Sequence, residues 1–188
     1  MTDQVELRQH PLPEEMRLLL DTYPRDAWRQ HPNFKEATRN WLAAHHMFRR
    51  LSEAVRKDAE ELLDGQMDSQ DYAARLSYRG NALVGNLQGH HGWEDHSYFP
   101  ELSAADPRFD AGLEILENDH QVLDEVLHDF VDAATRTLHF IALNRDDIVD
   151  EAAKVHGQAQ VIEKLLARHL ADEEDLAVPI ILHHKLRG

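Results

Sequence analysis

The sequence of 188 residues contains no cysteine. That absence excludes disulfide bonds, thiolate zinc sites, cysteine-ligated iron–sulfur clusters and cysteine nucleophiles. Any metal ion in this protein must therefore be held by nitrogen and oxygen atoms. Histidine is the abundant candidate, because 14 histidines are scattered along the chain.

Basic residues and long apolar runs are also scarce. Lysine and arginine number 20 against 35 acidic residues, which gives a formal net charge of −15. Nucleic acids and anionic membranes are bound by basic surfaces, so neither is expected as a partner. No apolar run approaches the roughly 20 residues of a membrane span. The first eight residues lack the basic-then-apolar layout of a signal peptide, so we expect a cytoplasmic protein. The oligomeric state stays open.

Strand-like alternation of β-branched residues is missing and helix-forming residues dominate, which predicts an all-α fold. Apolar periodicity predicts long helices over residues 33–63, 69–99, 111–143 and 146–178, with Pro100 and Pro179 ending the second and fourth. These helices suit an up-down-up-down four-helix bundle over residues 33–188. An N-terminal segment over residues 1–32, with a short helix at 14–22, is expected to pack on the bundle within a single domain.

A motif of histidine followed four residues later by glutamate, a second acid and then proline occurs twice. The two copies are His90 with Glu94 and His169 with Glu173, and the histidines expected to face them stand upstream at His45 and His120. At about 100° per residue, each histidine falls within the apolar stripe of its helix. Both glutamates fall on the same stripes, one turn later.

This combination is hard to explain as ordinary core packing. A single histidine on an apolar helix face is more often a core residue than a metal ligand. A buried, unpaired carboxylate, however, costs on the order of several kcal/mol or is forced to become neutral. No arginine or lysine lies on these stripes, whereas a pair of metal ions supplies positive charge directly. Imidazole with carboxylate suits iron, manganese, zinc or nickel, and helical bundles commonly house paired iron or manganese.

The stretches HHGWEDHSYFPEL (90–102) and RHLADEEDLAVP (168–179) resemble the hemerythrin-like, or HHE cation-binding, domain family, with the likeness covering about residues 35–180. The resemblance implies a four-helix bundle around a non-haem di-iron centre, bridged by oxide or hydroxide, with a position for O₂ or another small ligand. Zinc or manganese are possible substitutes for iron. The resemblance assigns one iron to His45 and His90, the other to His120 and His169, and the bridging positions to Glu94 and Glu173.

Two further positions are candidate ligands. Oxygen carriers of the family place two histidines one turn apart on the third helix, and here the position one turn after His120 is Asp124. Asp124 lies at the edge of the apolar stripe and is either a carboxylate ligand or a solvated residue. His91 lies at the margin of its face and is the second candidate. A site with less imidazole favours peroxide chemistry over reversible oxygen carriage.

The resulting prediction is a di-iron protein that binds O₂ or a related small molecule, in oxygen or iron handling or in sensing. One alternative is a di-iron oxidoreductase that acts on peroxide or nitric oxide, for which Asp124 is the one acid–base candidate. The other alternative is a metal-free helical bundle that acts through protein contacts. That alternative predicts that the six core positions hydrogen-bond to one another with no metal-sized gap.

Overall fold

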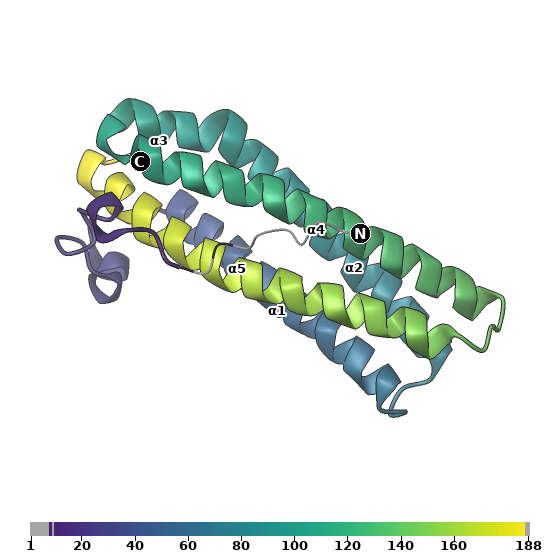
Figure 1. The fold of residues 1–188 in the computed structure, drawn as a ribbon. Helices are drawn as coiled ribbons and strands as arrows, with labels where there is room; N and C mark the ends of the chain where they lie inside the picture. Colours follow the sequence, from purple (N-terminus) through teal and green to yellow (C-terminus); the bar gives the residue numbers. More distant parts are fainter. Residues whose placement is uncertain (1–7, 9, 187–188) are drawn as a thin grey trace.

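Four long helices form an up-down-up-down bundle, which confirms the predicted all-α fold (Figure 1). The computed structural model describes residue 8 and residues 10–186, so the predicted ranges 1–32 and 33–188 each reach outside the described residues. The bundle helices are α1 (Glu36–Leu63), α2 (Ser69–Trp93), α4 (Asp110–Ala142) and α5 (Ile148–His184). Helices α1 and α4 each pack against both α2 and α5. Within the described part of the chain, no helix combines the length and hydrophobicity needed to cross a membrane.

The apolar stripes of the helices build two separate buried clusters rather than one continuous core. One cluster fills the half of the bundle around Phe48, Leu83 and Phe130. The other fills the end of the bundle where Phe99 and Ile181 are buried, close to the N-terminal segment. Each buried side chain of this size contributes about 1.5–3 kcal/mol through removal of apolar surface from water. On every bundle helix, the histidine singled out by the sequence lies where one cluster gives way to the other.

The predicted helix ends at Pro100 and Pro179 are wrong. Helix α2 ends earlier, at Trp93, and passes through one π-helical turn, η3 (Glu94–Tyr98), into the short helix α3 (Phe99–Ala105). Pro100 falls in the first turn of α3, where a backbone N–H is not required. Pro179 is buried inside α5, which continues to His184. Tertiary packing of the helix end therefore outweighs the one backbone hydrogen bond that this proline removes.

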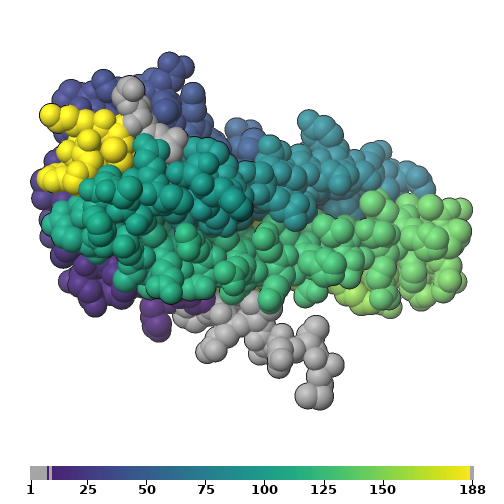
Figure 2. Space-filling model, turned by 90° about the horizontal axis from the view of Figure 1, so that it is seen from above, coloured from purple at the N-terminus to yellow at the C-terminus, as the bar shows by residue number. Residues whose placement is uncertain are grey.

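In the described part of the N-terminal segment, the helical structure consists of short 3₁₀ turns. The helix expected over residues 14–22 is limited to η1 (Glu14–Met16), and the expected linker contains η2 (Arg25–Gln30). The segment lies beside the end of α5, purple against yellow in Figure 1, and Figure 2 shows both at the same end of an elongated molecule. A further 3₁₀ turn, η4 (Pro107–Phe109), connects α3 to α4. The division into a packing segment and a bundle stays a prediction.

Candidate metal centre

One histidine from each bundle helix reaches a common polar layer between the two apolar clusters. The four side chains form two pairs across the bundle. The Nε2 atoms of His45 and His90 lie 3.1 Å apart, and those of His120 and His169 also lie 3.1 Å apart. The imidazoles of His45, His120 and His169 are buried, and the side chain of His90 is only 9% exposed, so their nitrogen atoms meet in the interior of the bundle.

The two glutamates of the motif lie between these pairs, and both are fully buried. The two Glu94 oxygens lie 2.8 Å from His90 Nε2 and 3.7 Å from His120 Nε2. Glu173 Oε2 lies 3.4 Å from His45 Nε2 and 3.8 Å from His169 Nε2. Each carboxylate therefore contacts one imidazole of each pair, which is the placement required of a carboxylate that bridges two ions.

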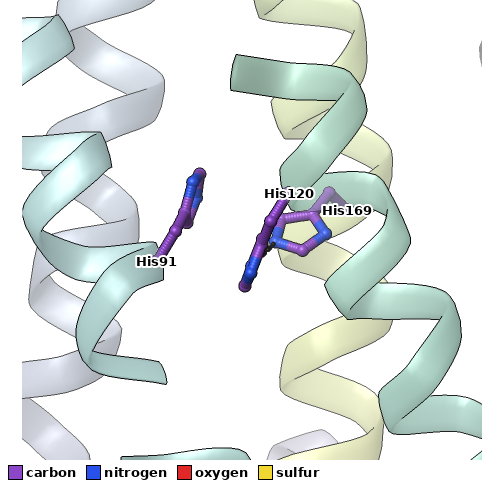
Figure 3. A group of neighbouring side chains, drawn as sticks. All are labelled: His91, His120 and His169. Carbon is purple, nitrogen blue, oxygen red and sulfur yellow. Dashed lines mark hydrogen bonds between the residues drawn. The ribbon is translucent and has the colours of Figure 1, made fainter. Parts of the chain in front are cut away.

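His91 joins the second pair. Figure 3 shows the rings of His91, His120 and His169 approaching one another from three helices, with the first two face to face. One ligand atom from each of these three side chains lies within 4.8 Å of the others, and His45, His90, Glu94 and Glu173 form a second group by the same measure. Adjacent helical residues point about 100° apart. His90 therefore faces α1, while His91 faces α4 and α5.

Asp124 lies apart from both groups. Its side chain is exposed on α4, although it stands one turn after His120. The structure thus brings together seven of the eight residues singled out by the sequence and leaves this one at the surface.

Carboxylates behind the histidines form a second set of contacts that the sequence interpretation missed. Three imidazoles each direct Nδ1 at a carboxylate: His45 at Glu174 (3.0 Å), His120 at Asp95 (2.7 Å) and His169 at Asp119 (3.4 Å). Histidines that bind metal through one nitrogen commonly donate the other N–H in this way, which fixes ring orientation and tautomer. The signal was present, because Asp95 and Glu174 are the second acids of the two motif copies.

Arginines pair with two of these carboxylates, Glu174 and Asp119, and two of the arginines come from the N-terminal segment. Arg25 and Arg49 hydrogen-bond to the two oxygens of Glu174, at 2.8 and 2.9 Å. Arg8 hydrogen-bonds to both Asp119 oxygens. Burial by itself raises the pKa of Glu174, but hydrogen bonds from His45 and Arg25 lower that pKa to about 2. Burial likewise raises the pKa of Asp119, but hydrogen bonds from His169 and Arg8 lower it, so Glu174 and Asp119 are charged and already paired.

The inner carboxylates are different, because the described residues leave most of their oxygens without a hydrogen bond. Trp41 Nε1 donates to Glu94 Oε1 at 2.7 Å, but Glu94 Oε2, both Glu173 oxygens and both His91 nitrogens have no hydrogen-bond partner among the described residues. Burial, together with repulsion from Glu94, raises the pKa of Glu173 well above its ordinary value. Burial lowers the pKa of His45 to about 4, which favours the neutral imidazole that binds metal.

This donor set fits metal cations. Leaving a buried oxygen without a hydrogen bond costs on the order of 1–3 kcal/mol, and more when the group is charged. A pair of cations between the imidazoles would satisfy these oxygens and neutralise both glutamates. The nitrogen and oxygen ligands present suit iron, manganese or zinc.

Comparison with known proteins agrees with this geometry. The family profile described as the hemerythrin HHE cation binding domain matches residues 36–181. The chain belongs to this family. Searches of curated proteins and of solved structures returned no match. The matched region of this hemerythrin-like domain begins at the start of α1 and includes the whole polar layer, whereas Arg8 and Arg25 lie outside it. Membership of the family implies that the domain binds metal cations.

Proposed function

We propose that this hemerythrin-like domain holds two iron ions and binds O₂ or a related small molecule, in oxygen or iron handling or in sensing. In this proposal His45 and His90 bind one ion, and His120 and His169 bind the other with His91 as a third imidazole. Glu94 and Glu173 would supply the carboxylate ligands shared by the two groups. When bound, a di-iron pair supplies redox chemistry and a position for a small ligand.

The observation that carries the proposal is a set of three buried glutamate oxygens that have no hydrogen-bond partner among the described residues. Two of them, Glu94 Oε2 and Glu173 Oε2, face imidazole nitrogens. Arg25 and Arg49 do not pair directly with these oxygens, because both are hydrogen-bonded to Glu174. A core with uncompensated carboxylates is expensive by several kcal/mol or more. In a metal-free interaction module nothing would offset the free-energy cost of burying these carboxylates. In a cation site the same carboxylates serve as ligands.

The surrounding residues prepare the ligands. The outer carboxylates hold the Nδ1 atoms of His45, His120 and His169, so that the opposite Nε2 atoms are directed into the polar layer. Trp41 holds one oxygen of Glu94 and thereby fixes the plane of that carboxylate. Apolar clusters on both sides of the layer exclude water, which strengthens every electrostatic interaction within it.

The number of ligands favours a pair of ions. A structural zinc ion takes four ligands in a tetrahedral arrangement. Here two ligand groups adjoin, one with three imidazoles and the other with two imidazoles and two carboxylates. Paired iron or manganese in a helical bundle is the usual use of such a set.

The test is metal analysis together with absorption spectra under air and under nitrogen. We expect yellow to brown protein with two irons per chain and strong near-ultraviolet absorption. Glu173→Gln keeps the size of the side chain and should lose the iron pair. Glu163→Gln is the matched control, because Glu163 lies on the same helix and pairs with Arg56 at the surface.

Two results would overturn the proposal and a third would support it. Folded protein that contains no iron and cannot be loaded with ferrous iron would support the metal-free interaction module. Rapid, repeated turnover of added peroxide would support the oxidoreductase. An oxygen adduct that reverses under vacuum would support the binding function proposed here.

A further inference from the structure

A pocket opens from the surface toward one side of the metal layer. It has a volume of about 210 Å³ and lies between the first turns of α1 and the region where α2 passes into η3. Its lining consists of Ala37, Thr38, Trp41, His90, Trp93 and Tyr98. We call it the Trp93 pocket. Ala37 and Trp93 are exposed and form its mouth, while Trp41 and Tyr98 are buried and form its inner wall.

The inner end of the Trp93 pocket reaches the ligand group of His45 and His90. His90 is itself part of the lining. Trp41 donates its indole N–H to Glu94, and its ring lies 4.2 Å from that of His45, measured between centroids. A molecule in this pocket would therefore contact His90, one of the side chains proposed to hold the metal pair, and would lie against Trp41 and Tyr98 of the second apolar cluster.

The walls of the Trp93 pocket are aromatic and uncharged. Trp93 stacks on Tyr98, with centroids 5.0 Å apart and planes 17° apart. The six lining residues include no lysine, arginine, aspartate or glutamate. The chain carries a net charge of −15, and Glu94 lies just behind Trp41. An anion would therefore find no basic side chain in the lining to pair with.

One polar group in the lining lacks a partner. The Thr38 hydroxyl is buried, the residue being only 1% exposed, and it makes no hydrogen bond to the described residues. Threonine hydroxyls in helices commonly satisfy themselves on a carbonyl of the preceding turn. Because Thr38 lies in the first turn of α1 and does not do so, its hydroxyl is available to an oxygen atom of a bound molecule.

We propose that the Trp93 pocket admits and binds an uncharged small molecule that has an apolar body and one oxygen able to hydrogen-bond, the class that includes alkyl hydroperoxides. The aromatic walls hold the apolar body, and Thr38 holds the oxygen beside His90. The volume corresponds to about seven water molecules at about 30 Å³ each, which is more than a diatomic ligand requires. The inference deepens the proposed function, since it names the ligand class of the same site.

Xenon tests the pocket without reference to iron, because it occupies dry apolar cavities. In crystals of the protein as purified, pressurised with xenon, we expect xenon density between Trp41 and Trp93. Ala37→Trp should fill the mouth and abolish that density. Ala43→Trp is the matched control, since Ala43 is also an exposed alanine of α1 but lines a different pocket, with His46 and Met47. Absence of xenon from the wild-type pocket would overturn the proposal.

A second probe tests the polar end and the charge preference. Tert-butyl alcohol is an unreactive relative of a hydroperoxide, and pivalate is an anion with the same apolar body. We expect the alcohol to change tryptophan fluorescence on binding, and pivalate to bind much more weakly. Thr38→Val should weaken binding of the alcohol about three- to tenfold, the loss of one neutral hydrogen bond, and should leave xenon in place. Equal binding of pivalate and the alcohol would overturn the proposed ligand class.

These outcomes separate the two proposals. Protein that contains no iron but binds xenon and the alcohol in the Trp93 pocket would overturn the proposed function. The proposal that the pocket binds a small molecule would still stand. Protein with two irons per chain and neither probe in the pocket would overturn only the pocket. In iron-loaded protein, Ala37→Trp should also slow association of nitric oxide with the ferrous form, whereas Ala43→Trp should not. Equal rates in all three proteins would contradict the pocket as a route to the metal.

Discussion

The imidazole of His91 lies flat against that of His120, with ring centroids 4.1 Å apart and planes 12° apart. Both nitrogens of His91 are buried without a hydrogen-bond partner among the described residues. Position 124, one turn after His120, carries an exposed aspartate. A third imidazole thus approaches His120 and His169 from α2 and not from α4, and this arrangement distinguishes the chain from the oxygen carriers it resembles.

Replacing His91 with phenylalanine tests this arrangement. His91→Phe keeps a ring that can stack on His120 but removes both nitrogen atoms. We expect the iron content to fall toward one ion per chain and the near-ultraviolet absorption of the pair to be lost. His96→Phe is the control, because His96 is exposed and directs Nδ1 at the backbone carbonyl of Gly92. Two irons per chain with an unchanged spectrum would remove His91 from the ligand set.

Replacing Asp124 with alanine tests the other uncertain ligand. Since Asp124 is exposed and lies outside both ligand groups, Asp124→Ala should leave iron content and absorption spectrum unchanged. Its free energy of unfolding should shift by no more than about 0.5 kcal/mol, as for most surface substitutions. A loss of iron in this variant would place Asp124 at the centre after all.

Removing the charge of Glu174 tests the outer carboxylates. Glu174→Gln preserves the size of the side chain but weakens its hold on the His45 imidazole. Loss of such a contact behind a metal ligand typically lowers metal affinity about 10- to 100-fold. Competition with a chelator would measure the change.

The matched control for Glu174 is Asp58→Asn. Asp58 is also a buried carboxylate held by two arginines, Arg75 and Arg79, but it belongs to neither ligand group. We expect this variant to lose stability and to keep its metal affinity. Equal losses of affinity in both variants would mean that Glu174 acts through general stability and not through His45.

Asp106 provides a pH-dependent prediction away from the metal layer. Hydrogen bonds from Arg108 and His184 lower the pKa of Asp106 below its ordinary value, against the opposing effect of burial. A carboxylate whose pKa is lower in the folded state stabilises the fold above its unfolded pKa of about 4, and that contribution is lost as the pH falls below this value.

Urea unfolding at several pH values would measure this contribution. We expect Asp106→Asn to be less stable than the wild type by about 1–2 kcal/mol at pH 7, from the weakened charge-assisted hydrogen bonds. The difference should shrink as the pH falls from about 4 toward 2. Asp21→Asn, at an exposed turn residue, should differ little from the wild type at any pH. A difference for Asp106→Asn that stays constant with pH would contradict the lowered pKa.

Features that depend on spacing within a single helix could be predicted from the sequence. An interval of four residues places His90 with Glu94, and His169 with Glu173, on one helical face. The apolar stripes predicted that those faces are buried. Two buried carboxylates need compensating positive charge, which indicated bound cations. The helix ends at Pro100 and Pro179 could not be predicted in this way, because local preference disfavours proline while the packing of Phe99 and Ile181 in the core favours continued helix.

The sequence by itself determined the four-helix bundle and the helical faces that carry the imidazoles, because both follow from the repeat of the α-helix. Only the tertiary structure decided which neighbour each side chain meets. It turned His91 toward His120, left Asp124 in solvent, and placed Glu174 behind the histidine of another helix. Those choices depend on how the helices are rotated and displaced relative to one another, and the periodicity of one helix contains no information about the rotation of the next.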